Sequence, residues 1–172
     1  AHHARATGSL PLGVPSSFQH WDPYPISIES AKGAWLKDVD GRPLLDLSMG
    51  FGAMLVGHLN PTVVAAVTLA LETGTLFVTP SPSATEVAER FQRRFGLDLV
   101  RFANSGTEAT MYAVRTARAY THRHAIVKIE GGYHGGYDAL AVSVKPDVAE
   151  AGPEGFPIPV VPFDVEAGTV HV

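Results

Sequence analysis

Apolar positions recur in two different ways along the chain. In the N-terminal part, three short apolar runs at 26–28, 34–36 and 44–47 are separated by turn residues. Runs of this length with turns between them are typical of a small antiparallel β meander.

Strand and helix patterns alternate further along. A predicted strand at 99–103 is followed by a helical pattern at 108–120, a second strand at 125–129 and an apolar run at 140–144. This alternation indicates parallel strands. The sequence therefore predicts an α/β fold, in which an arm and a meander precede the start of a mainly parallel α/β sheet.

Two further helices have recognisable start signals. Asn60 and the proline after it predict the start of a helix over 63–73. Ser83 and Glu86 form the pattern of a capping box, which predicts a second helix that ends at Gly96.

The remaining segments suggest how the chain is organised. Residues 8–25 are rich in glycine, proline and serine, so we expect an extended arm there. The apolar residues at 159–163 supply at most one further strand. We expect the arm and meander to occupy residues 1–60 and the first part of a larger α/β domain to occupy residues 61–172.

Composition narrows the class of partner. The 172 residues are 45% apolar, which can fill a core, and 13 basic against 17 acidic residues give a net charge of -4. This balance offers no electrostatic footprint for nucleic acid or an anionic membrane, so a small-molecule partner is favoured. The absence of cysteine fits a reducing cytoplasm, where we expect the protein. No run approaches the ~20 apolar residues of a membrane span.

A small polar turn joins the predicted strand at 99–103 to the helix that follows. Ser105, Gly106 and Thr107 lie where the unpaired N–H groups of a helix N-terminus bind anions, and the two hydroxyl groups add donors. A phosphate group fits this pattern. The alternative is that Ser105 only caps the helix, and spacing alone does not separate the two interpretations. Neither nucleotide-binding fingerprint is present, which disfavours ATP and NAD.

A glycine-rich loop follows the next predicted strand. Four glycines surround Tyr133 and His134, so the backbone can bend and present an aromatic face beside a neighbouring site. Because both loops follow parallel strands, we expect them at the same edge of the sheet. The alternative is an ordinary glycine-rich turn. No second ligand lies at zinc spacing from His134, so no metal site is predicted.

Taken together, these motifs resemble the class III aminotransferases that depend on pyridoxal 5'-phosphate (PLP), and most closely the glutamate-1-semialdehyde 2,1-aminomutase branch. The resemblance spans nearly the whole chain and follows the family's order. The segments that carry it are residues 10–14, 22–26, 31–34, 38–41, 56–61, 104–109 and 131–135.

The resemblance implies the fold type I of PLP-dependent transferases, present here in its N-terminal part. It also implies that Ser105, Gly106 and Thr107 hold the PLP phosphate, that Tyr133 stacks on the pyridine ring, and that His134 lies near the ring edge.

Three other positions follow from the same resemblance. Glu108 matches an acidic residue beside the cofactor contacts, and Phe51 falls where relatives place an aromatic residue next to the substrate. The alternative for Phe51 is a core residue of the meander. Gln19 falls where aminomutases carry an arginine that pairs with a substrate carboxylate. An uncharged amide cannot replace that salt bridge, which disfavours glutamate-1-semialdehyde as the substrate.

The family's Schiff-base lysine is expected outside these 172 residues, together with the aspartate that pairs with the pyridine nitrogen. Lys32, Lys37, Lys128 and Lys145 are the lysines of the chain, and none lies in a matching motif. We therefore expect no catalytic residue in this chain, which would be the N-terminal part of a complete enzyme.

The resemblance implies transfer of an amino group between an amine or amino acid and a keto acid or aldehyde. An aminomutase and a non-catalytic PLP-fold binding module remain the alternatives. It also implies a homodimer, in which residues 8–25 and 75–82 are expected to reach the partner.

Overall fold

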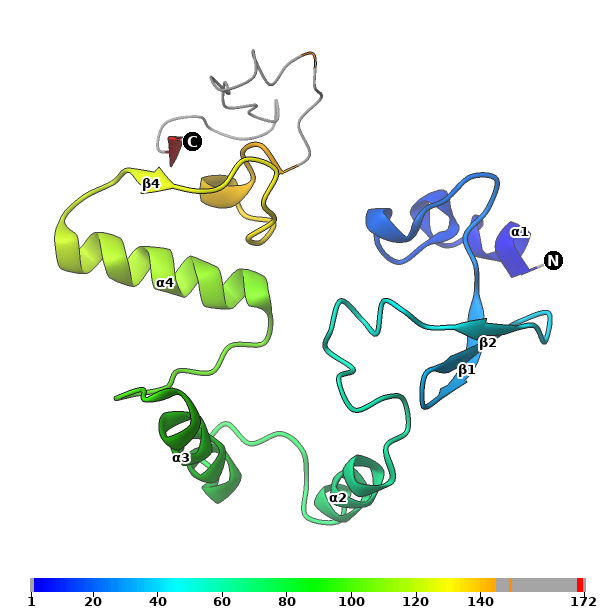
Figure 1. Ribbon diagram of the computed structural model, residues 1–172, viewed down its shortest axis with the longest axis horizontal. Coiled ribbons are helices and arrows are strands. Elements are labelled where there is room, and N and C mark those ends of the chain that lie inside the picture. The colour runs from blue at the N-terminus through cyan, green and yellow to red at the C-terminus, as the bar shows by residue number, and fades with distance from the viewer. Residues whose placement is uncertain (1, 145–148, 150–169, 172) are drawn as a thin grey trace. The chain divides into compact units, whose positions relative to one another are not determined.

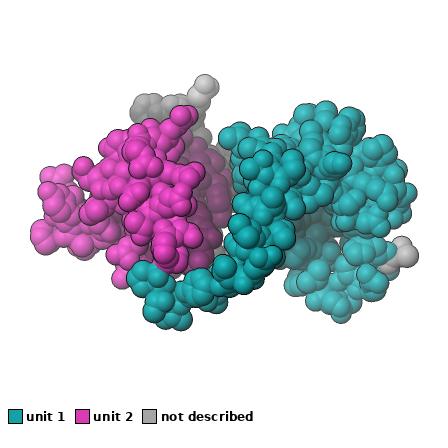
Figure 2. Space-filling view, turned by 90° about the horizontal axis from the view of Figure 1, so that it is seen from below, with its two compact units in different colours: residues 1–80 teal, residues 81–172 magenta. Residues whose placement is uncertain are grey.

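The computed structural model describes residues 2–144, 149 and 170–171. The chain divides into two compact units, residues 1–80 and 81–172 (Figure 2). The boundary expected after residue 60 stays a prediction. None of the helices in the described ranges combines the length and apolar character that a membrane span requires.

The first unit contains the predicted meander (Figure 1). Strands β1 (Ile28–Lys32), β2 (Trp35–Asp38) and β3 (Pro43–Leu45) form an antiparallel sheet in the order β1-β2-β3. The prediction is confirmed, although the first strand begins at the end of its apolar run and continues through polar residues. A meander with one solvated face tolerates such residues.

The arm at residues 8–25, which the sequence predicts to be extended, is not extended throughout. It contains two single 3-10 turns, η1 (Pro11–Gly13) and η2 (Ser17–Gln19), and helix α1 (His2–Ala6) precedes it. Proline at the first position of η1 has its φ fixed near the value that a turn requires, and it has no N–H to leave unpaired. The arm is thus a series of short turns.

The second half of the first unit carries helix α2 (Pro61–Leu71). The Asn60 side chain accepts hydrogen bonds from the N–H groups of Thr62 (3.0 Å) and Val63 (3.3 Å). The predicted N-cap is confirmed, and the helix ends two residues earlier than expected.

Helix α3 (Pro82–Phe95) opens the second unit, and its predicted capping box is wrong. The helix begins with Pro82 in its first turn, so Ser83 lies inside it and cannot cap it. Glu86 instead pairs with Arg90 one turn later, at 2.6 Å. The predicted end is confirmed, because Gly96 terminates the helix in a left-handed conformation with φ 65°.

The rest of the second unit has helix α4 (Gly106–Thr121), the short strand β4 (Ile126–Val127), the turn η3 (Asp138–Leu140) and β5 (Val170–His171). Strand β4 pairs in parallel with β5, as the α/β alternation predicts. In Figure 1 the chain after β4 returns above α4, so that its loop lies near the N-terminal end of the helix.

Two predicted strands are not formed. Residues 99–103 lack strand structure and, within the described ranges, have no neighbouring strand to pair with. The apolar run at 140–144 is instead a turn that buries Leu140 and Val142. The stretch predicted at 159–163 lies outside the described residues.

Candidate functional site

The N-terminus of α4 forms a reciprocal cap. The Ser105 side chain accepts a hydrogen bond from the Glu108 N–H at 3.1 Å, and the Glu108 carboxylate accepts one from the Asn104 N–H at 2.6 Å. Ser105 therefore does cap the helix, and this role does not prevent it from also binding an anion. Its hydroxyl proton is still available, because in this bond the oxygen only accepts.

Two amide groups at this turn are available to a ligand. Within the described ranges, no hydrogen bond is formed by the N–H groups of Gly106 or Thr107. Both belong to the first turn of a sixteen-residue helix, whose dipole favours an anion there. A Cβ built on Gly106 would meet no atom within 4 Å, so the space beside the turn is open. The turn can therefore hold a phosphate-sized anion.

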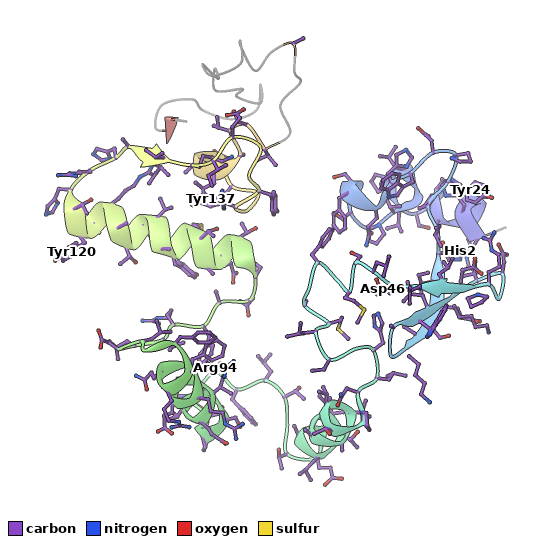
Figure 3. All side chains as sticks on the ribbon, in the orientation of Figure 1. His2, Tyr24, Asp46, Arg94, Tyr120 and Tyr137 are labelled. Atoms are coloured by element: carbon purple, nitrogen blue, oxygen red, sulfur yellow. The ribbon has the colours of Figure 1, made fainter. Side chains whose placement is uncertain are left out.

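The glycine-rich loop is docked onto this same turn. The Thr110 hydroxyl lies 2.7 Å from the carbonyl oxygen of His134, and the Gly136 N–H donates to the Thr107 hydroxyl oxygen at 3.3 Å. The Tyr137 hydroxyl lies 3.4 Å from the Thr110 carbonyl oxygen, in the space between loop and helix (Figure 3). The two motifs that the sequence placed at one sheet edge are thus in direct contact.

Gly135 permits this close approach. The residue is buried and has φ +112°, and a Cβ built there would lie 2.9 Å from the Thr107 Cα atom. Real Cβ atoms do not come so close to backbone atoms, and residues other than glycine rarely adopt this φ. The sequence contained four glycines in this loop, but only the three-dimensional contact identifies Gly135 as the one against the helix.

Lys128 closes the base of the loop. Its side chain is buried, and its ammonium group donates to the carbonyl oxygens of Leu140 and Val142. The Gly131 N–H donates to the Ser143 carbonyl oxygen at 2.8 Å beside it. Burial lowers the pKa of Lys128, while the charge of Glu130 opposes that effect. These contacts give Lys128 a structural position.

The side chains of Tyr133 and His134 remain accessible. Tyr133 is 68% exposed, and its hydroxyl lies 3.8 Å from the position of a Cβ on Gly136, the residue that contacts Thr107. The His134 ring folds back over Gly132, at 2.9 Å from a Cβ built there. An exposed aromatic face is therefore tied by the backbone to the anion-binding turn.

Phe51 and Gln19 belong to the first unit. Phe51 is 84% exposed, so it is not a core residue of the meander in this structure. Its ring meets that of Phe18 edge to face, with centroids 5.8 Å apart, and Gln19 follows Phe18 in the exposed turn η2. Phe51 also has a positive φ of 56°, a conformation that costs a non-glycine residue about 1 to 2 kcal/mol.

Asp46, labelled in Figure 3, directly follows β3 and anchors the loop that carries Phe51. Its carboxylate accepts hydrogen bonds from the N–H groups of Ser48 (3.0 Å) and Met49 (2.8 Å), and it lies 2.7 Å from the His58 Nε2 atom. The bond with His58, followed by that from Met49, holds the pKa of Asp46 below its ordinary value. No local pattern predicts this pairing, because the two residues are twelve positions apart.

Known proteins resemble this chain in sequence and in fold. The profile of the family described as aminotransferase class-III matches residues 17–168. A glutamate-1-semialdehyde 2,1-aminomutase of Methanocella arvoryzae is 39% identical over 169 residues, which cover 97% of this chain and 39% of that protein.

Two solved structures have the same fold. One is a transaminase with PLP bound, which superposes with a TM-score of 0.84 and 38% identity over 94% of this chain and 37% of its own. The other is an omega-transaminase from Sphaerobacter thermophilus, with a TM-score of 0.85 and 36% identity over 97% of this chain and 37% of its own.

The chain spans 39% of the length of the aminomutase and 37% of each transaminase. Its fold is that of the corresponding part of the transaminases, which confirms the predicted fold type I. The match over residues 17–168 covers most of the sequence. The chain belongs to the class III aminotransferase family.

Proposed function

We propose that the full-length protein is a PLP-dependent aminotransferase, which transfers an amino group between an amine or amino acid and a keto acid or aldehyde. One observation carries the proposal: an open anion-binding turn and an exposed aromatic loop are bonded together through Thr107 and Thr110. A cofactor with a phosphate at one side and an aromatic ring at the other matches that pair of features.

The residues of this chain fit such a cofactor. The N–H groups of Gly106 and Thr107, with the Ser105 and Thr107 hydroxyl groups, would hold the phosphate at the positive end of the helix dipole. Tyr133 would cover the face of the ring, and His134 would lie near its edge. When bound, PLP supplies an electron sink for the carbon that carries the amino group.

Glu108 is assigned an indirect role. Its carboxylate already accepts the Asn104 N–H, so it would shape the turn rather than touch the cofactor.

Phe51 and Gln19 are assigned to the substrate. The neutral Gln19 amide offers hydrogen bonds but no charge, which suits an amine or an amino acid more than a substrate that requires a salt bridge. The aminomutase reaction is the second candidate, and the 39% identity to an aminomutase favours it. We also propose that the protein acts in the cytoplasm as a homodimer.

The test uses the purified full-length protein. After incubation with PLP and gel filtration, we expect it to retain the cofactor and to transfer amino groups from amines or amino acids to pyruvate. Isomerisation of glutamate-1-semialdehyde in place of transfer would support the aminomutase. Retention of PLP with neither activity would identify a binding module, and failure to retain PLP would contradict all three.

A substitution series at Tyr133 tests the assigned ring contact. Stacking is worth about 0.5 to 1.5 kcal/mol beyond burial, so Tyr133→Ala should weaken PLP binding by about 2- to 12-fold, whereas Tyr133→Phe should keep most of the affinity and activity. PLP dissociation constants and the melting temperature of the cofactor-free protein are measured on the same samples.

The exposed position of Tyr133 sharpens this comparison. Because the side chain buries little surface in the described structure, its removal should leave the cofactor-free melting temperature nearly unchanged. Equal PLP affinity in all three proteins would refute the stacking assignment.

A further inference from the structure

Thr110 joins the two halves of the proposed cofactor site without belonging to either. It lies one turn into α4, is half-buried, and directs its hydroxyl group at the loop that carries Tyr133. We propose that Thr110 is a positioning residue that sets the distance between the phosphate-binding turn and the aromatic ring. This inference rests on the proposed function, because it assumes that both halves contact one cofactor.

The hydroxyl group has a choice of acceptors but only one proton. Its oxygen lies 3.0 Å from the Gly106 carbonyl oxygen, 3.1 Å from that of Thr107 and 2.7 Å from that of His134. The first two are contacts within the helix, of the kind any threonine makes to the preceding turn. The shortest of the three distances is the one to the loop. The Thr110 hydroxyl therefore donates its proton to the His134 carbonyl oxygen.

Two threonine hydroxyl groups attach the loop to the helix, in addition to the Tyr137 hydroxyl at the Thr110 carbonyl oxygen. The Gly136 N–H donates to the Thr107 hydroxyl oxygen, and the Thr110 hydroxyl donates to the His134 carbonyl oxygen. Thr107 and Thr110 are three positions apart and lie on one face of the helix. Together these attachments fix the orientation of the loop, and the one at His134 is nearest in sequence to Tyr133. The Tyr133 ring, one residue before His134, is oriented as a result.

The two threonines therefore have different parts. Thr107 also stands in the turn that would hold the phosphate, so its loss would affect the anion directly. In the described structure the Thr110 hydroxyl has hydrogen-bond contacts only with backbone carbonyl oxygens, two in the helix and one in the loop. Loss of the Thr110 hydroxyl would therefore weaken contacts with the ring of the cofactor and leave the contacts with its phosphate unchanged. Affinities for PLP and for inorganic phosphate can be measured separately to test this difference.

The experiment compares Thr110→Val, Thr110→Ser and Thr121→Val with the parent, in the full-length protein. Valine keeps the shape of threonine and removes the hydroxyl, whereas serine keeps the hydroxyl. Thr121 is the matched control, because its hydroxyl makes the same contact four residues back along α4, to Ala117 at 2.7 Å, but no contact with the loop is described for it. Four quantities are measured: affinity for PLP, affinity of the cofactor-free protein for inorganic phosphate, circular dichroism of bound PLP, and hydrogen exchange at 131–137.

Thr110→Val should weaken PLP binding about fivefold, as expected for the loss of one neutral hydrogen bond, and should change the circular dichroism of the bound ring. Inorganic phosphate should bind as in the parent. Exchange in the loop should accelerate in the cofactor-free protein. Thr110→Ser should restore all three properties, and Thr121→Val should alter none of them.

Two results would overturn the inference while the proposed function stood. The first is a Thr110→Val protein with parental PLP affinity and circular dichroism. The second is an equal loss of phosphate and PLP affinity, which would mean that Thr110 only stabilises the helix start. A parent that binds no PLP would instead refute the proposed function, and with it this assignment.

Discussion

Replacing Gly135 with alanine is expected to lower the PLP affinity of the full-length protein by about 100-fold. A Cβ at this position would lie 2.9 Å from the Thr107 Cα atom, and backbone cannot move aside as a flexible side chain can. The φ of +112° adds strain of about 1 to 3 kcal/mol, and the contact adds an overpacking cost of similar size. A combined cost of about 3 kcal/mol corresponds to that loss if the loop leaves the helix.

Gly131 provides the matched control in the same loop. It also has a positive φ, of 72°, but a Cβ built there would meet no atom within 4 Å. Gly131→Ala should therefore show only the strain of the left-handed conformation, about 1 to 2 kcal/mol, which limits the loss in PLP affinity to about 5- to 30-fold. Titration of both variants with PLP measures the difference. Equal losses would show that the contact with Thr107 does not matter for the site.

Removal of the Thr107 hydroxyl is the second change with a large expected effect. Thr107→Ala deletes a donor to the phosphate and the acceptor of the Gly136 N–H. A hydrogen bond to a charged group contributes about 1.5 to 3 kcal/mol, so we expect PLP to bind about 10- to 150-fold more weakly. Thr107→Ser retains the hydroxyl and should recover most of the affinity.

Ser105→Ala serves as the comparison for Thr107. The Ser105 hydroxyl caps α4, so its loss should lower the melting temperature of the cofactor-free protein as well as PLP affinity. Thr107→Ala should lower mainly the affinity. If Ser105→Ala reduced stability and left PLP binding unchanged, the serine would be a helix cap and no more.

Local signals in the sequence predicted the elements that depend on neighbouring residues. Asn60 capping α2 and Ser105 capping α4 each need only the next three residues, and both predictions hold. The predicted start of α3 was wrong because two local signals competed. The helix begins at Pro82, whose φ already suits a first turn, and the serine that follows lies inside the helix.

Other features depend on partners far along the chain. The strand expected at 99–103 required a neighbouring strand, which its own residues cannot supply. The roles of Gly135 and Thr110 arise where the loop meets a helix that begins about 30 residues earlier. The sequence identified the loop and the turn as chemically suited to one ligand, but which glycine and which threonine join them was visible only in three dimensions.

The buried ammonium group of Lys128 has a consequence for the chemical reactivity of the chain. An acyl donor needs a neutral amine with an open approach, whereas this nitrogen is enclosed by the carbonyl oxygens of Leu140 and Val142. Lys32 is exposed by comparison, whereas the exposed Lys37 is paired with Glu29 at 2.8 Å, which raises its pKa. Acetylation of the folded protein would therefore modify Lys32 before Lys128. Acetylation of Lys128 would trap whichever molecules had opened the base of the loop, because an uncharged, longer side chain could not return between the same two carbonyl groups.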